Sequence, residues 1–285
     1  MYYAYLNGKA TQDRIVSQLA KSSGFHLLHS RHFIKNGIPP KAKKVMFAGI
    51  TNGNAELYRR CVKYGIEFYY IDHAYFNAGY AKPTWMRITK NGFVQNQTWS
   101  VSNTRYARCS ASETTVQKIN YAQNRKILIL PPTYATANVF WVDVDKWVNE
   151  KVEQVRQIVD WPIEIRHKPH QLLVDTWGNP IGRTEKIKQK PLREEFSDTY
   201  CVIAYNSNAT VDAVTANIPV ITDQNCATWP VSNDIKDLLN LKLPAGAKKT
   251  ELFNSLGHGQ YNLSEMRTGH AWRSLQNLPE QYKLQ

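Results

Sequence analysis

The stretch that decides the fold, residues 200–223, reads YCVIAYNSNATVDAVTANIPVITD. The apolar run at 201–204 predicts a buried strand, which passes into a polar turn at 205–208. Val211, Val214 and Ile218 recur three and four residues apart, which predicts a helix with one apolar face. Pro219 ends that helix before a second apolar run at 220–222. Strand, helix and strand in such close succession predict a parallel βαβ unit within an α/β fold.

Small polar residues occupy the point at which the first of these strands passes into the helix. Ser207, Asn208 and Thr210 lie there, where unpaired backbone N–H groups and the positive end of the helix dipole favour a phosphate. Asp212, one turn into the helix, is then within reach of the hydroxyls of a ribose. The same residues also suit a capped helix without a ligand, and the sequence leaves both interpretations open.

A second βαβ unit is predicted in the first half of the chain. Strands at 45–50 and 66–71 flank a helix at 55–64, and Asp72 and His73 follow the second strand. Ligands of open α/β sheets bind at the carboxyl edge, so these side chains are candidate functional groups. Asp72 is suited to take a proton from an acceptor hydroxyl, and it could equally be a turn cap. His73 is the alternative base, or a side chain that orients Asp72.

Two further strand ends carry polar residues in the second half. The strand at 127–130 leads into a turn containing Thr133, and the strand at 162–166 is followed by His167 and Lys168. Together with the amino end of the helix that follows Ser207 and Asn208, these groups could neutralise a leaving phosphate without a metal. We therefore predict two Rossmann-like domains facing across a cleft. Residues 1–120 would bind the acceptor, residues 121–260 the nucleotide sugar, and residues 261–285 would form helices that pack back on the body.

The charge balance points to a negatively charged partner. The 285 residues carry a formal net charge of +13, with 36 Lys and Arg against 23 Asp and Glu. Residues 74–104 mix aromatic and basic side chains without a helical period and are predicted to be irregular loops with short strands. Tyr75, Trp85, Arg87 and Lys90 could there bind the bases and phosphates of DNA, or the aromatic residues could fill a core.

Other site classes are disfavoured by the spacing of their candidate ligands. The four cysteines are far apart, and His26, His29 and His32 have no carboxylate or cysteine beside them, so no metal site is expected. The sequence has neither a signal-like start nor a long apolar run. We expect a protein of the cytoplasm, that of a host cell if the source is viral, with no membrane partner.

Four segments carry a resemblance to a known family. IEIRHKPH at 163–170 followed by YNSNATVDAVTANIPVITD at 205–223 resembles the His-Pro and Ser-Ser motifs of the capsule-polysaccharide Kdo transferases and related GT-B glycosyltransferases. The tail LFNSLGHGQYNLSEMRTGHAW and the segment YIDHAYF are similar to the same proteins. The resemblance implies that His167 and Ser207 hold the nucleotide phosphate, that Asp212 meets the ribose and that Asp72 is the general base. Here Lys168 separates His167 from Pro169, and Asn208 and Asp212 replace a serine and a glutamate.

The basic composition also resembles that of phage DNA-base glycosyltransferases, which would have to extrude the base that they modify. The expected function is metal-independent, inverting transfer of a sugar to a hydroxymethylated pyrimidine in phage DNA. The expected co-substrate is a nucleotide sugar, most simply a UDP-sugar, and no cofactor is expected. The alternatives are transfer to a polysaccharide and a non-catalytic nucleic-acid-binding protein on a GT-B scaffold.

Overall fold

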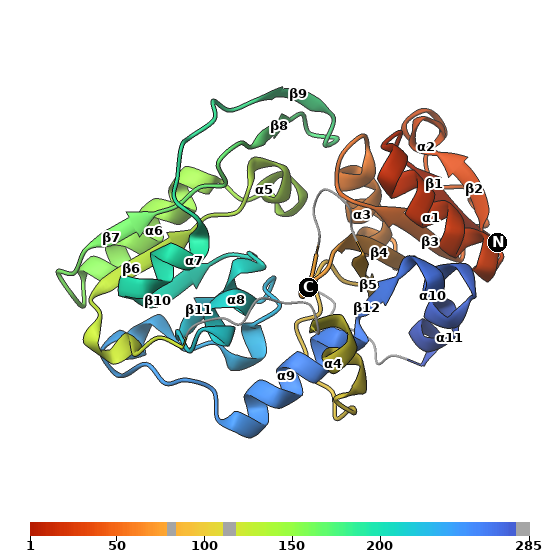
Figure 1. Cartoon of the computed structure of the whole chain (residues 1–285). Coiled ribbons are helices and arrows are strands. Elements are labelled where there is room, and N and C mark those ends of the chain that lie inside the picture. The colour runs from red at the N-terminus through yellow and green to blue at the C-terminus, as the bar shows by residue number, and fades with distance from the viewer. Residues whose placement is uncertain (79–83, 111–117, 278–285) are drawn as a thin grey trace.

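The computed structural model describes residues 1–78, 84–110 and 118–277, which form two α/β domains with helices packed on their sheets (Figure 1). The strands are β1 (Tyr2–Leu6), β2 (His26–His29), β3 (Lys44–Ala48), β4 (Glu67–His73), β5 (Trp85–Lys90), β6 (Lys126–Leu130), β7 (Ile163–Ile165), β8 (Leu172–Val174), β9 (Pro180–Arg183), β10 (Thr199–Ala204), β11 (Val220–Thr222) and β12 (Gln260–Asn262). The helices are α1 (Ala10–Ser23), α2 (Ser30–Asn36), α3 (Asn54–Lys63), α4 (Thr104–Ser110), α5 (Tyr134–Phe140), α6 (Val144–Arg156), α7 (Leu192–Glu195), α8 (Ala209–Thr215), α9 (Gly246–His258), α10 (Leu263–Arg267) and α11 (His270–Gln276).

The first domain is built on a six-stranded sheet in the order β12-β5-β4-β3-β1-β2. Strands β1 to β4 pair in parallel, whereas β5 and β12 are antiparallel to their neighbours. Alternate residues point to opposite faces, so Met46 packs with α1, α10 and α11 while Phe47 packs with α2 and α3. Both faces are therefore covered, and functional groups are left at the carboxyl edge.

The second domain has a four-stranded parallel sheet in the order β11-β10-β6-β7. Val202 of β10 pairs with Val220 of β11 in parallel register, and α8 connects the two strands. This confirms the α/β fold predicted from residues 200–223. The core between α8, α9 and this sheet contains Val202, Val214 and Leu256, and the opposite face packs against α6.

The C-terminal part of the chain crosses back to the first domain. Helix α9 runs from the second domain to contact α4, and β12 then joins the edge of the first sheet beside β5 (Figure 1). Helices α10 and α11 follow and pack against α1. Residues 278–285, which belong to the predicted C-terminal helical segment, lie outside the described residues.

Residues 74–104, predicted to be irregular loops with short strands, include strand β5, whose Arg87 and Thr89 are buried despite their polarity. Helix α6 begins at Val144, because Trp141 caps α5 in a left-handed conformation (φ 55°) and the Asp143 side chain caps α6.

A hairpin of β8 and β9, absent from the sequence prediction, reaches from the second domain to the first (Figure 1). Its turn residue Gly178 accepts a hydrogen bond from the Asn52 backbone at 3.0 Å. Trp177 packs against Phe33, with ring centroids 6.2 Å apart, and Arg59 donates to the Thr176 carbonyl oxygen. Through these contacts the hairpin connects the two domains on one side.

We expect Gly178→Ala to loosen this contact. Gly178 has φ +82°, and an added Cβ would lie 2.5 Å from the Ile50 carbonyl oxygen and 2.8 Å from the Ala55 Cβ. The left-handed strain and the clash should together cost about 1–3 kcal/mol, measurable as a lower free energy of unfolding in urea. Gly182→Ala is the matched control, since its Cβ would meet only Leu173 at 3.7 Å. Equal losses in the two variants would contradict the role assigned to the Gly178 contact.

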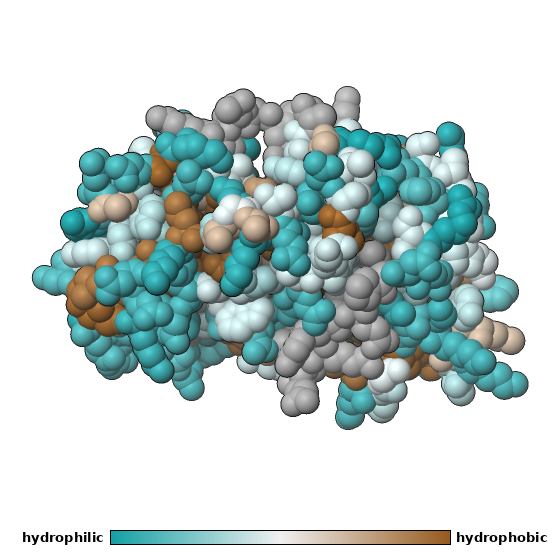
Figure 2. All heavy atoms as spheres, turned by 90° about the horizontal axis from the view of Figure 1, so that it is seen from below, coloured by the Kyte–Doolittle hydropathy of each residue, from teal (hydrophilic) through white to brown (hydrophobic). Residues whose placement is uncertain are grey.

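The surface carries its apolar side chains in small groups. Figure 2 shows one face covered mostly by hydrophilic residues, with apolar patches scattered between them. Within the described ranges, no helix is long and apolar enough to span a membrane.

Candidate functional site

A cleft of about 630 Å³ lies between the two domains, and residues of both line it. It brings together the ends of β4 and β5 in the first domain and the turns after β6, β7 and β10 in the second. Ten of the residues predicted from the sequence line this interdomain cleft: Asp72, His73, Tyr75, Arg87, Thr133, His167, Lys168, Ser207, Asn208 and Asp212.

The turn after β10 is the predicted phosphate site. The Ser207 Oγ accepts a hydrogen bond from the Ala209 backbone N–H at 3.2 Å, and Asn208 sits at the cap position of α8. Thr210, predicted to bind the donor, is fully buried, and its hydroxyl donates to the Ser207 carbonyl oxygen at 2.8 Å. Thr210 therefore stabilises the turn through this hydrogen bond. Its side chain points into the core and does not line the cleft.

Thr133 lies on the same wall as Ser207, at the start of α5, because β6 and β10 are neighbours in one sheet. Its Oγ1 accepts from the Thr136 backbone N–H at 3.2 Å and lies 3.0 Å from the Thr136 hydroxyl. The turn after β6 is therefore capped by its own side chains, and both threonines still line the cleft. A donor-binding role for Thr133 stays a prediction.

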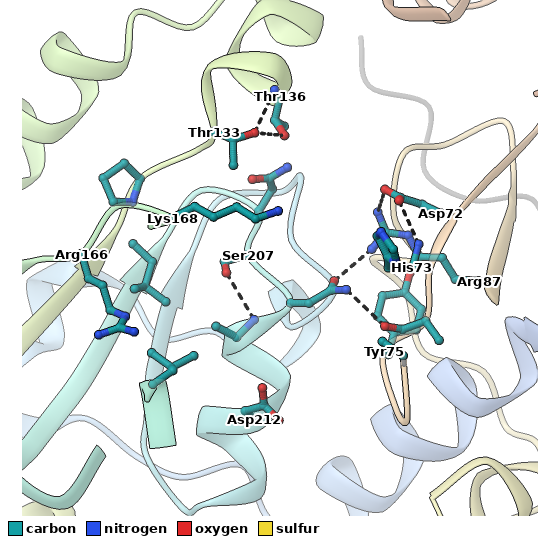
Figure 3. Close-up of a pocket in the computed structure, with 18 of the residues that line it drawn as sticks. Asp72, His73, Tyr75, Arg87, Thr133, Thr136, Arg166, Lys168, Ser207 and Asp212 are labelled. Atoms are coloured by element: carbon teal, nitrogen blue, oxygen red, sulfur yellow. Dashed lines mark hydrogen bonds and ion pairs between the residues drawn. The ribbon is translucent and has the colours of Figure 1, made fainter. Parts of the chain in front are cut away.

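Asp72 occupies the opposite wall, where three donors surround its carboxylate. Oδ2 accepts from the Tyr70 hydroxyl at 2.8 Å. Oδ2 also accepts from Arg87 at 2.9 Å, and Oδ1 accepts from the His73 backbone N–H at 2.8 Å (Figure 3). Burial by itself would raise the pKa of Asp72, but the charges of Arg87 and His73 and the hydrogen bonds outweigh it and lower the pKa. Asp72 is thus an ionised group at neutral pH.

His73 is next to Asp72 and also faces the cleft. Burial lowers the pKa of His73, and the neighbouring cations Arg87, Lys168 and Lys9 act in the same direction against the opposing charge of Asp72. At neutral pH the imidazole is therefore largely neutral and able to accept a proton. The geometry does not separate it from Asp72 as the candidate base.

Arg87 was predicted to contact the acceptor from a segment of irregular loops and short strands, and it lies in β5, from which it lines the cleft. It is 4% exposed and bridges Asp72 to Asn208 of the other domain, donating to the Asn208 Oδ1 at 2.9 Å. Tyr75 is buried beside it, and its hydroxyl accepts from the Gln95 backbone N–H at 2.8 Å.

The other two predicted acceptor contacts lie away from the cleft. Trp85 is 8% exposed and packs in the core with Phe76, so it cannot act as a stacking platform. Lys90 pairs with Glu67 at 3.9 Å, at the far end of β5 from the cleft. Strand β5 lies between β4 and β12 in a sheet whose two faces are covered, so Trp85 fulfils the alternative that the sequence left open, an aromatic residue that fills a core.

Cations dominate the second-domain wall. Arg166 and Arg193 line it together with Lys168 and His167, and neither arginine was singled out from the sequence. Arg166 ends the strand predicted at 162–166 and directly follows β7, which was a usable signal, whereas Arg193 lies on the short helix α7. Figure 3 shows Arg166 and Lys168 on the side of Ser207, with the Lys168 side chain extending toward the Asp72 wall. The Arg166 guanidinium donates to Glu195 of its own domain at 3.1 Å.

Asp212 is the acidic residue of this wall. It lies 3.8 Å from Arg193, and burial raises the pKa of Asp212 although Arg193 opposes the shift. The carboxylate points into the cleft below Ser207 (Figure 3). It is placed where it could accept hydrogen bonds from the hydroxyls of a ligand held at the turn.

The described residues hold no group of three His, Cys, Asp or Glu side chains suited to a metal. In the predicted histidine cluster, His29 caps α2 by accepting from the Arg31 backbone N–H at 3.2 Å, and His32 lies 3.3 Å from the Asn36 amide nitrogen. All four cysteines are buried.

No family model and no curated protein matches this sequence. Among solved structures, the beta Kdo 2,7 transferase of Thermosulfurimonas dismutans KpsC matches with a TM-score of 0.53 and 11% identity, covering 96% of this chain and 98% of that chain. The chain has a GT-B fold.

Two further structures match with lower TM-scores. The beta Kdo 2,4 transferase of the same KpsC has a TM-score of 0.49 and 11% identity, covering 89% of each chain. The Methanocaldococcus jannaschii UDP-GlcNAc 2-epimerase, solved with UDP-GlcNAc and UDP, has a TM-score of 0.30 and 12% identity, covering 88% of this chain and 98% of that chain. The match with a TM-score of 0.53 confirms, at the level of the fold, the GT-B resemblance expected from the motifs around His167 and Ser207.

Proposed function

We propose that this protein is a glycosyltransferase that moves a sugar from a nucleotide sugar to an acceptor hydroxyl. The observation that carries the proposal is the interdomain cleft, which places a carboxylate at a strand end of one domain opposite a cationic wall in the other. A glycosyl transfer needs both parts, one to receive the proton of the acceptor and one to stabilise the departing phosphate.

The second domain is suited to the donor. A diphosphate at the Ser207–Asn208 turn would lie among Arg166, Lys168 and Arg193, whose charges favour it without a metal. Asp212 would reach the ribose from the first turn of α8, and His167 would contact the phosphate from the turn after β7. We take the donor to be a UDP-sugar.

The first domain is suited to the acceptor. Asp72, ionised at neutral pH, would accept the proton of the attacking hydroxyl, with His73 as the alternative base beside it. Attack from the Asp72 wall on a sugar whose phosphate lies on the opposite wall would invert the anomeric centre.

We consider two candidate acceptors for this site. The net charge of +13 favours a polyanion, and we keep hydroxymethylated DNA as the first candidate. A polysaccharide is the second, favoured by the fold shared with a protein described as a Kdo transferase. The burial of Trp85 and Arg87 removes two of the contacts that were expected to favour DNA.

The test is to incubate the protein with a panel of nucleotide sugars and three acceptors: hydroxymethylated DNA, plain DNA and an oligosaccharide. Nucleotide released only with hydroxymethylated DNA supports the first acceptor, and release only with the oligosaccharide supports the second. DNA binding without release under any donor would overturn the enzyme proposal and favour a non-catalytic DNA-binding protein.

A further inference from the structure

Arg87 touches the functional groups of both walls at once. Its Nη2 donates to the Asp72 Oδ2 and its Nη1 donates to the Asn208 Oδ1, each at 2.9 Å (Figure 3). These partners lie 15 and 121 residues away along the chain and belong to different domains. One planar guanidinium therefore connects the candidate base to the turn that would receive the phosphate.

In this arrangement Asp72 is a weak base. Its Oδ2 accepts two hydrogen bonds, from Tyr70 and Arg87, and its Oδ1 accepts one from the His73 backbone. Its side chain is only 23% exposed. Protonation of Asp72 would weaken these hydrogen bonds and remove the attraction to the positive charge of Arg87. Both effects favour the ionised carboxylate.

The second partner of Arg87 is a neutral amide oxygen. Asn208 directly follows Ser207 and also donates through its Nδ2 to the Ala74 carbonyl oxygen at 3.3 Å. A phosphate oxygen brought to this turn would be a charged acceptor, and such hydrogen bonds are about twice as strong as neutral ones. It would compete with Asn208 and with Asp72 for the same guanidinium.

We propose that Arg87 is a positioning residue that holds Asp72 as a weak base while the cleft is empty and shifts toward an anionic donor group when one occupies the Ser207–Asn208 turn. The inference rests on the proposed function, because it takes this turn as the phosphate site and Asp72 as the base. It adds an order of events to that function: the donor must bind before Asp72 becomes an effective base. Asp72 would then not take the proton of an acceptor hydroxyl while the cleft holds no donor.

Several other charged or titratable groups surround Asp72 and must be held constant in a test. Tyr70 and His73 belong to the same strand, Tyr75 follows it, Lys9 lies in the loop before α1, and Lys168 faces the adjacent His73 from the second domain. All of them are present in every variant described below. A difference between variants therefore reports on the Arg87 contact.

The test is to titrate the Asp72 carboxyl by ¹³C NMR in the intact protein, with and without UDP. UDP should raise the pKa of Asp72 by roughly one unit or more, because the guanidinium charge is drawn away and a negative charge is added. In Arg87→Met the pKa should already be higher without UDP, since burial then acts unopposed by Arg87. UDP should add a smaller increment there than in the wild type.

A second variant leaves β5 untouched, in case Arg87→Met fails to fold. Asn208→Asp places a permanent carboxylate where the phosphate would compete, and it should raise the pKa of Asp72 in the absence of UDP. Arg193→Met is the matched control, because Arg193 is a cation of the same cleft that contacts Asp212 and not Asp72. It should weaken UDP binding and keep the full UDP-dependent increase at Asp72 once UDP is saturating.

The outcomes separate this inference from the proposed function. If UDP shifts the Ser207 backbone amide resonance and leaves the Asp72 pKa unchanged, the donor site stands and the Arg87 inference is overturned. If the pKa of Asp72 is the same in Arg87→Met and wild type, Arg87 does not hold Asp72 as a weak base, and the inference is likewise overturned. If UDP moves neither Ser207 nor Asp72, the donor site itself is wrong and the inference falls with it.

Discussion

Asp72→Asn should reduce turnover by a factor of roughly 10²–10⁴ and leave donor affinity near that of the wild type. The asparagine keeps an oxygen that can accept from Arg87 and Tyr70, so the wall should retain its shape. It removes the carboxylate that would take the acceptor proton. The measurement is kcat and KM for nucleotide release, with UDP affinity determined separately by calorimetry.

Asp212→Asn provides the contrast from the opposite wall. Asp212 lines the donor side, so this variant should raise the donor KM more than it lowers kcat. If Asp72→Asn retains full turnover while His73→Gln loses it, the base is His73 and the assignment to Asp72 is wrong.

Glu195→Ala should lower the free energy of unfolding by about 3 kcal/mol, because it leaves buried cations without their partner. Glu195 is 3% exposed and accepts from Lys126 at 3.0 Å and from Arg166 at 3.1 Å. Lys126 keeps its contacts with Glu164 and Asp198, which places the expected loss at the lower end for buried ion pairs. Arg166 lines the cleft, so donor affinity should fall as well.

The same variant should change the acid sensitivity of the fold. Burial alone would raise the pKa of Glu195, but Lys126 and Lys190 lower it below its ordinary value of 4.5. A depressed pKa contributes stability that is present above pH 4.5 and lost as the pH falls through the lower value in the folded protein. Glu195→Ala should therefore flatten the fall in stability below pH 4.5, and the exposed Glu185→Ala should leave it unchanged. If the free energy of unfolding falls equally below pH 4.5 in the wild type, Glu195→Ala and Glu185→Ala, the role assigned to Glu195 is contradicted.

The sequence predicts those parts of the fold whose signals are local. The apolar runs around residues 201–204 and 220–222, with the helical spacing between them, lead directly to β10, α8 and β11. The ends of β4 and β7 were likewise predictable as positions for functional groups, because parallel strands end at a common edge.

The rest depends on contacts between distant residues. Arg87 resembles a surface residue in the sequence, and only its partners Asp72 and Asn208 account for its burial. Strand β12 has three residues and is defined by pairing with β5, which lies far earlier in the chain. Thr210 could not be distinguished from Ser207 by residue type, since the direction of each side chain is set by how α8 packs.

A structure of the protein with bound UDP tests the central claim most directly. We predict that the diphosphate lies at the Ser207–Asn208 turn, in contact with His167 or Lys168, with Asp72 facing the terminal phosphate from the other wall of the cleft. UDP bound outside this cleft, or with its phosphates against the first domain and its uracil at Ser207, would contradict the account.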